Sequence, residues 1–265
     1  MPVRPRVLAP IALACLIALS GCVSAPPTTR AQASAPPAHW TYEGVDGPGN
    51  WGKLSAAYQE CGVGEEQSPI DLPAAVPAST QETAITLAQP TSDGHADDTG
   101  HTGQFWPAHP ATTLSHGGRS FELKQLHYHT PSEHTIAGKP AAAEFHFVHE
   151  DAAGHHLVLA VLGQKGKPTP GMDAFVNAAT AGEDVGATLN FESILPAASA
   201  YYTYEGSLTT PPCSQSVPWI VLSTPITLSE AQLTKLEKLH GEIARPVNPI
   251  GERSISGGSA TVKRG

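Results

Sequence analysis

Alternating apolar and polar residues dominate the middle of the chain and predict a series of β-strands. Over 121–129, every second side chain would point to the same face of a strand, and 143–148 follows the same rule. The continuous apolar run 157–162 is typical of a strand buried on both faces. A further strand is predicted over 216–222, where Pro218 lacks a ladder hydrogen bond and indicates an edge or a bulge. The predicted fold class is therefore mainly β.

One helix has a complete signature in the sequence. Ser229 and Gln232 form a predicted capping box, leucines recur after it at helical spacing, and Gly241 ends the pattern. Residues 90–110 are rich in Asp, Gly, His and Thr, and are expected to form a loop with at most a short strand. Residues 254–265 are small, polar and glycine-rich, and are expected to form a loose tail.

The N-terminal segment resembles a secretory signal of the bacterial lipoprotein type. Two arginines precede an apolar run over 7–19, which is too short to span a membrane. The run ends in Leu19-Ser20-Gly21-Cys22, which resembles the site where lipoprotein signals are cut before a cysteine that then carries lipid. We expect lipidation of Cys22, which would tether the protein to a membrane without spanning it. The alternative is cleavage nearby without lipid.

These features give an expected layout for the whole chain. Because Val23 and Ser24 include no aspartate, the resemblance to lipoprotein sorting rules predicts the periplasmic side of the outer membrane. The expected parts are a signal peptide (1–21), the lipidated cysteine with a flexible Pro/Ala/Ser/Thr-rich tether (22–38), one domain (39–256) and a loose tail (257–265).

The four cysteines leave one pair for the folded part of the chain. Cys15 lies in the apolar run of the signal, and Cys22 would carry lipid. In an oxidising periplasm, Cys61 and Cys213 are expected to form a disulfide, with two free buried thiols as the alternative. The bridge would close a loop of about 150 residues, which the chain-entropy model equates with roughly 4–5 kcal/mol of stabilisation.

The formal net charge of −9 excludes two classes of direct partner. Cleavage of the signal would also remove Arg4 and Arg6 and make the mature protein more acidic. An acidic protein is repelled by nucleic acid and by anionic membrane surfaces. We therefore expect no nucleic-acid partner and no membrane contact except through the lipid anchor.

Three histidines provide the clearest candidate chemistry. His127 and His129 share a strand face, and an antiparallel neighbour would bring His146 to complete a triangle. Three imidazoles with one open position are a ligand set for a catalytic Zn²⁺. A zinc-bound histidine usually donates its other ring N–H to a fixed acceptor. Gln125 and Glu144, each two residues before a ligand, are the predicted acceptors.

Further motifs surround these histidines. They are Gln125-Leu-His-Tyr-His-Thr-Pro-Ser-Glu-His134, Ala143-Glu-Phe-His-Phe-Val-His149, Tyr204-Glu-Gly-Ser-Leu-Thr-Thr-Pro-Pro212, Gln67-Ser-Pro-Ile-Asp71 and Arg245-Pro-Val-Asn248. In these motifs and in their order along the chain, the sequence resembles the α-class carbonic anhydrases, from about Trp40 to Arg253. The resemblance implies a large, twisted, mostly antiparallel central sheet with a few short peripheral helices, and zinc in a cone-shaped cleft.

The resemblance implies reversible hydration of carbon dioxide to bicarbonate and a proton, by attack of a zinc-bound hydroxide. Glu133 is expected to fix the hydroxyl proton of Thr209, so that Thr209 orients the attacking group. Carbon dioxide is small and apolar and needs a dry wall. The expected substrate pocket consists of Val148, Val161, Leu208, Thr210, Val217 and Trp219.

A histidine that titrates near neutrality can carry the released proton to buffer. The family places this shuttle in a Gly-His-Thr-like segment, which matches Gly100-His101-Thr102. His95 is the alternative candidate for the shuttle. Thr99 occupies a position where the family usually has asparagine. His134 is expected to brace the site. The remaining histidines are predicted to be surface or capping residues, namely His39, His109, His116, His149, His155, His156 and His240.

Two other functions compete with this prediction. The chain could be a catalytically silent zinc-binding module, although such relatives typically lose a zinc histidine and all three are present here. It could also be a weak zinc esterase. By resemblance, sulfonamides and anions are expected inhibitors, and the protein is expected to be a monomer or a homodimer.

Overall fold

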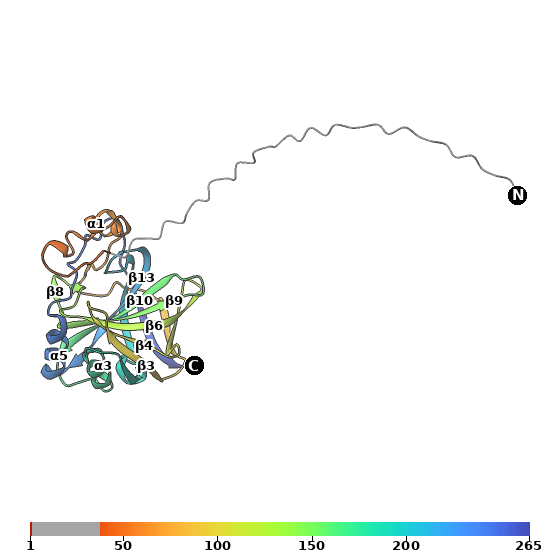
Figure 1. The fold of residues 1–265 in the computed structure, drawn as a ribbon. Coiled ribbons are helices and arrows are strands. Elements are labelled where there is room, and N and C mark those ends of the chain that lie inside the picture. The colour runs from red at the N-terminus through yellow and green to blue at the C-terminus, as the bar shows by residue number, and fades with distance from the viewer. Residues whose placement is uncertain (2–37) are drawn as a thin grey trace. The chain divides into compact units, whose positions relative to one another are not determined.

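The computed structural model describes Met1 and residues 38–265, and eleven strands of this part form one large sheet (Figure 1). The predicted signal, Cys22 and nearly all of the tether lie outside the described residues. In spatial order the strands are β11 (Val185–Asn190), β3 (Thr91–Asp98), β4 (Gly103–Pro107), β6 (Arg119–His129), β5 (Thr112–His116), β2 (Glu82–Leu87), β14 (Ser256–Arg264), β12 (Ala198–Ser207), β13 (Gln215–Leu228), β10 (His156–Lys165) and β9 (Ala143–Glu150).

Most neighbours in this sheet are antiparallel, and two pairs, β10 with β13 and β14 with β2, are parallel. Strand β9 also pairs with β6, which places the two predicted histidine strands side by side. A small second sheet contains β1 (Asp71–Leu72), β7 (Thr135–Ile136) and β8 (Lys139–Pro140). The prediction of a mainly β fold around a large, mostly antiparallel sheet is confirmed.

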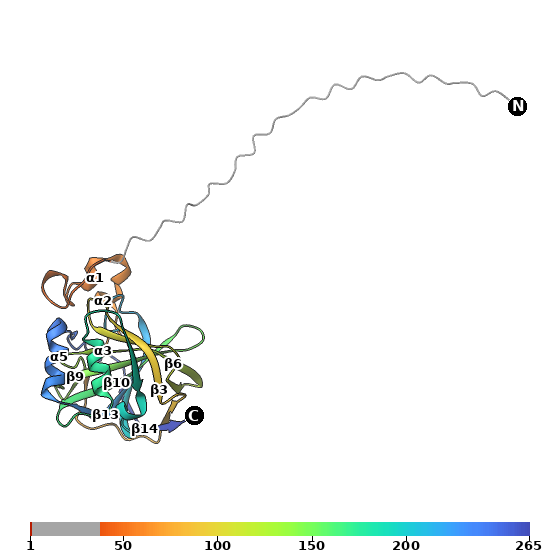
Figure 2. The ribbon, with the colours of Figure 1, turned by 60° about the horizontal axis from the view of Figure 1, so that its bottom comes forward.

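Short helices surround the sheet. The longest is α5 (Glu230–His240), which begins at the predicted Ser229–Gln232 capping box and ends before Gly241. Helices α1 and α2 lie together, away from α3 and α5 (Figure 2). The remaining helices are η1 (Gly44–Asp46), α1 (Trp51–Leu54), η2 (Ala56–Tyr58), α2 (Glu60–Val63), α3 (Met172–Ala179) and α4 (Phe191–Ile194). In the described part of the chain, none of these helices has the length and hydropathy needed to cross a membrane.

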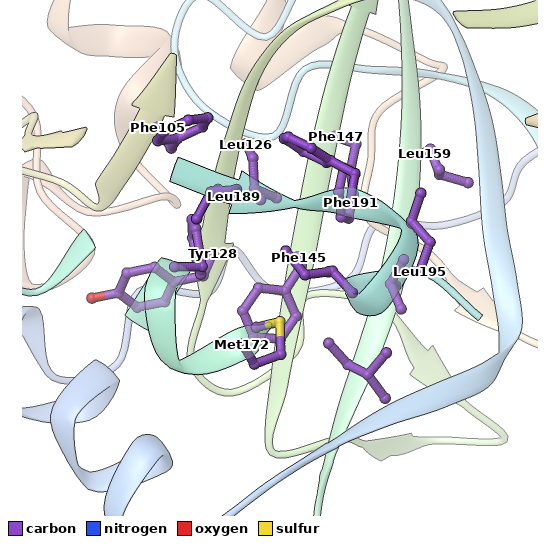
Figure 3. Close-up of a cluster of buried hydrophobic side chains, with 14 of the residues drawn as sticks. Phe105, Leu126, Tyr128, Phe145, Phe147, Leu159, Met172, Leu189, Phe191 and Leu195 are labelled. Carbon is purple, nitrogen blue, oxygen red and sulfur yellow. The ribbon is translucent and has the colours of Figure 1, made fainter. Parts of the chain in front are cut away.

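The main core lies on one face of the sheet, where aromatic side chains from the strands meet α3 and α4 (Figure 3). Phe145 and Phe147 of β9 point into it, and Phe175 of α3 packs edge-on against Phe145. The residues between them on β9 point to the opposite face. This alternation divides β9 into a core side and a side that faces the candidate site.

Two segments expected to be irregular are strands. Within 90–110, β3 and β4 pair with each other, because Ala96 and Phe105 are fully buried and anchor them in the core. The predicted loose tail is β14, which pairs with β2 and β12. Its glycines allow close packing, since a Cβ on Gly258 would lie 2.2 Å from the Tyr201 ring. The glycine-rich composition that predicted a flexible tail is therefore what this close packing requires.

Two further sequence predictions are tested by the fold. Cys61 and Cys213 form the expected disulfide, which ties α2 to the segment before β13. Pro218 lies inside the sheet rather than at an edge. The bulge is present beside it: Ser216 has a φ of +63°, and the register with β12 shifts there. Pro218 is paired with Glu205 of β12, and pairing of β13 with β10 starts only at Trp219, so β10 requires no hydrogen bond from Pro218.

Candidate metal centre and active site

The pairing of β6 with β9 assembles the predicted histidine triangle. His127 lies directly opposite His146 in the ladder, and His129 follows His127 on the same face. The Nε2 atoms of His127 and His129 are 3.1 Å apart, and one nitrogen from each of the three rings lies within 4.8 Å of the others. His129 and His146 are buried, whereas His127 keeps some exposure at the cleft. The three predicted ligands are therefore brought together.

Each of the three rings is held through its second nitrogen. His127 Nδ1 lies 2.8 Å from Gln125 Oε1, and His146 Nε2 lies 3.0 Å from Glu144 Oε1, as predicted. His129 Nδ1 lies 2.7 Å from the backbone carbonyl oxygen of Ile243, a partner that the sequence analysis missed. A carbonyl carries no side-chain signal, so no motif could have identified it.

These contacts make the triangle suitable for a metal ion. Because the acceptors are oxygens, each bound ring nitrogen carries the proton and its other nitrogen presents a bare lone pair. Three lone pairs thus converge at short range. Burial also lowers the pKa of all three rings, to about 4 for His129, which keeps them neutral. Neutral imidazoles that point at one spot are the donor set of a zinc site with an open position.

Glu144 is the centre of a buried network behind the triangle. Its carboxylate accepts from His146, from the His134 ring at 2.6 Å and from the His134 backbone N–H at 2.8 Å. Burial alone would raise the pKa of Glu144, but His134 and His146 hold it well below its usual range. His134 Nε2 lies 2.8 Å from the Tyr204 hydroxyl. His134 therefore lies in the expected bracing position.

Glu133 lies beside the triangle. Its Oε1 accepts from the Arg245 backbone N–H at 2.9 Å, and its Oε2 lies 3.4 Å from His129 Nε2. Burial raises the pKa of Glu133 to about 7, and a hydrogen bond from the Thr209 hydroxyl has only a small lowering effect on it. The contact with Thr209 is loose, because Oε2 has no partner of standard hydrogen-bond geometry in the described part of the chain. The predicted Glu133–Thr209 pair is nevertheless assembled.

A cavity of about 220 Å³ opens directly onto the triangle. Four of the six predicted pocket residues line it, and they are Val148, Leu208, Thr210 and Trp219. Thr209, His127 and His146 also line it. Val217 packs in the same apolar cluster as Trp219 without lining the cavity. The wall next to the triangle is thus largely apolar, as carbon dioxide would require.

Val161 was predicted wrongly as a pocket residue. It is fully buried in the main core, opposite Phe145, because directly paired strand residues share a face. Val158, opposite Val148, takes the position in the pocket wall. Val158 and Val161 lie in the same continuous apolar run. The register of β10 against β9 decides which of them faces the pocket.

The two candidate shuttle histidines lie in different places. A second cavity, of about 200 Å³, is lined by His101 together with His127, His129 and Thr210. The His101 ring stacks flat on Trp40 with centroids 3.6 Å apart. His95 stacks instead on Trp106 on strand β3, and it lines none of the cavities described here. Of these two candidates, His101 is therefore the one that shares a cavity with the triangle.

The prediction of a surface or capping position is wrong for His149 and incomplete for His156 and His240. His149 is fully buried, lies 2.9 Å from the Thr112 hydroxyl, and burial lowers its pKa to about 4. His156 lines the pocket beside Val158. His240, at the end of α5, is paired with Asp98.

Comparison with known proteins agrees with this geometry. The model of the family described as eukaryotic-type carbonic anhydrase matches residues 46–256. A carbonic anhydrase of Pectobacterium carotovorum is 36% identical over 248 residues, which cover 92% of this chain and 98% of the relative. One from Nostoc sp. is 36% identical over 247 residues, covering 89% of this chain and 90% of the relative.

A solved structure extends the similarity to the fold. It is the α-carbonic anhydrase of Thermovibrio ammonificans in complex with the inhibitor sulfanilamide. It superimposes with a TM-score of 0.77 at 36% sequence identity, covering 86% of this chain and all of that chain.

Proposed function

This chain belongs to the α-class carbonic anhydrases, and we propose that it hydrates carbon dioxide reversibly with a zinc ion bound by His127, His129 and His146. The observation that supports zinc is the convergence of three neutral imidazoles, each fixed through its second nitrogen, beside an apolar cavity. When bound, zinc lowers the pKa of a coordinated water to about 7 and so makes a hydroxide nucleophile available at neutral pH.

Glu133 and Thr209 supply orientation. If the Thr209 hydroxyl donates its proton to Glu133, its oxygen can only accept, so it aligns an O–H donor in the pocket. The backbone contact from Arg245 fixes the Glu133 carboxylate for this task. The apolar wall around Val148, Val158 and Trp219 excludes water and gives carbon dioxide a surface without competing hydrogen bonds.

We assign the proton shuttle to His101. Its ring lies at the cavity that also reaches two ligand histidines, and burial together with His39 and His240 lowers its pKa. A proton that leaves the cleft would be taken up by His101 and released to buffer. His95 has no comparable access to the ligands.

Stopped-flow hydration of carbon dioxide tests the proposed function. The purified protein should hydrate carbon dioxide far faster than buffer, should lose this rate after removal of metal by a chelator, and should regain it with Zn²⁺. Sulfanilamide should inhibit, as expected from the similarity to the inhibited relative. A zinc-loaded protein with no rate above buffer would exclude the enzyme and favour the silent zinc-binding module.

We also propose that the mature protein is held by lipid at Cys22 on the periplasmic side of the outer membrane. The support is the Leu19-Ser20-Gly21-Cys22 sequence and the absence of aspartate at 23 and 24. Labelled fatty acid should be incorporated into the wild-type protein and not into Cys22→Ser. Equal labelling of both would exclude this anchor. Membrane fractionation then tests the location, and light scattering tests monomer against homodimer.

A further inference from the structure

His101 stands between two cavities. The inner cavity, of about 200 Å³, reaches the ligand histidines, and the outer cavity, of about 460 Å³, is lined by three histidines, His39, His101 and His240. Trp40, Tyr42 and His101 line both. The His101 ring therefore faces the proposed ligands through the inner cavity and two further imidazoles through the outer cavity. His39 is exposed, and its ring centroid lies 6.4 Å from that of His101.

One histidine of the outer cavity, His240, is paired with an aspartate, Asp98. His240 Nε2 lies 2.7 Å from Asp98 Oδ1, and the two side chains are only 16% and 24% exposed. Because the carboxylate can only accept, Nε2 carries the proton and Nδ1 of neutral His240 presents a lone pair. The ring also lies in the last turn of helix α5, where positive charge is favoured by the helix dipole.

Asp98 connects this pair directly to the shuttle. The same Oδ1 accepts the backbone N–H of Gly100 at 2.8 Å, next to His101 in the turn between β3 and β4. His240 therefore adjoins His101 through the outer cavity, and Asp98 adjoins it through the backbone of the turn. The carboxylates that line the outer cavity are those of Glu43 and Glu242, together with His39 and His240, and Asp98 acts on His101 by its charge without lining the cavity.

We infer that the His240–Asp98 pair is a second proton acceptor, which receives the proton of His101 and passes it to buffer. This inference rests on the proposed shuttle role of His101. Protonated His101 gives up one ring proton to water in the outer cavity, and that water gives a proton to His240 Nδ1. Asp98 keeps the Nε2–H bond and balances the positive ring. Buffer then removes the proton, so both histidines return to their neutral state.

The charge–charge effects on His101 fit this direction of transfer. After burial, the charges of His39 and His240 lower the pKa of His101, and the Asp98 carboxylate raises it. A positive charge on His240 therefore discourages a second proton from staying on His101. The two residues of the pair have opposite effects on the pKa of His101. Loss of His240 should raise this pKa, and loss of Asp98 should lower it.

Two conservative variants test the inference. His240→Gln keeps a donor for Asp98 but cannot carry a proton, and Asp98→Asn keeps the acceptor oxygen but loses the charge. Hydration by His240→Gln should fall on the order of threefold in kcat in weak buffer, because water in the cavity partly replaces a positioned proton carrier. The loss should disappear in concentrated imidazole buffer. His109→Gln, an exposed histidine outside these cavities, is the matched control.

Titration of the His101 ring by NMR supplies a readout that a structural role would not give. His240→Gln should raise the His101 pKa, and Asp98→Asn should lower it. A His240→Gln rate equal to wild type in weak buffer would overturn the inference, as would an equal loss in weak and concentrated buffer. A loss seen with His39→Gln in place of His240→Gln would assign the role to His39. If the wild-type protein itself shows no hydration in any buffer, the proposed function fails.

Discussion

The imidazoles at the base of the cleft and the imidazole of His101 are held in opposite ways. His127, His129 and His146 lie on paired strands, and each ring is fixed by a hydrogen bond through its second nitrogen. His101 lies in a turn beside Gly100, which has a φ of +83°, and its ring rests on Trp40 by stacking. Within residues 38–265, no hydrogen-bond partner of the His101 ring was found.

This difference separates two tasks that one residue type can perform. A metal ligand must present one nitrogen in one direction, so rigid strands and a second hydrogen bond are required. A proton carrier must exchange its proton with both sides, so a ring held by stacking, which leaves its nitrogens available, suits this task. Substitutions in the two groups should therefore affect different properties of the protein.

Removal of a ligand should have the greatest consequence. His129→Ala should weaken zinc binding on the order of 10³-fold or more, because loss of only the outer hydrogen-bond partner of a ligand already costs about 10–100-fold. Hydration should be lost with the metal. Metal analysis and stopped-flow rates on the same sample test this, with His109→Ala as the control. Retained zinc and activity would show that the ligands are misassigned.

Removal of the orienting hydroxyl should spare the metal. Thr209→Ala should lower the hydration rate roughly 10²-fold, the usual effect of losing one positioned hydrogen-bond partner in an active site. Thr209→Ser keeps the hydroxyl and should recover most of the rate. Zinc content should be equal in both variants. A serine variant as slow as the alanine variant would assign the effect to the lost methyl packing.

Lowering the pH should destabilise the fold through the buried histidines rather than through the exposed ones. The folded pKa of His149, about 4, lies below its unfolded value, so its contribution to stability is present above about pH 6.5 and is lost as pH falls toward 4. Between pH 7 and pH 5 this amounts to about 2 kcal/mol for one such histidine. The metal-free ligand histidines, whose pKa values are also lowered, act in the same direction.

Glu133 has the opposite effect on the pH dependence of stability. Its folded pKa of about 7 is raised, so its contribution is present below about pH 4.5 and is lost as pH rises through 7. Denaturant titrations of the metal-free protein at pH 7 and pH 5 should still show a net loss of stability at pH 5. His149→Gln should reduce the pH dependence. A free energy of unfolding that is flat with pH would contradict these buried neutral histidines.

Substitution of the shuttle should have the mildest effect. His101→Ala should slow turnover by about tenfold in weak buffer, because water in the cleft replaces the histidine inefficiently. Added imidazole should restore the rate, and zinc content should not change. His95→Ala is the matched comparison, since that ring stacks on Trp106 away from the cavities. A loss with His95→Ala and none with His101→Ala would reverse the assignment.

Residue type and strand periodicity were sufficient to predict most residues of the candidate site. The order of the motifs indicated the family, and two-residue spacing placed Gln125, His127 and His129 on one face. The same rule linked Glu144 to His146. These predictions succeeded because each depends on side chains that are close in sequence and on a backbone whose alternation is fixed by local geometry.

The sequence by itself therefore determined the fold class and the pairing of the two folded cysteines, and it identified the three histidines that the structure brings together. Only the tertiary structure decided that Val158 rather than Val161 lines the pocket, because the face of a continuous apolar strand depends on its register. It also supplied the Ile243 carbonyl, which is chemically the same in every residue, and turned the glycine-rich C-terminus into a packed strand. Such contacts join segments far apart in the chain, so no local pattern encodes them.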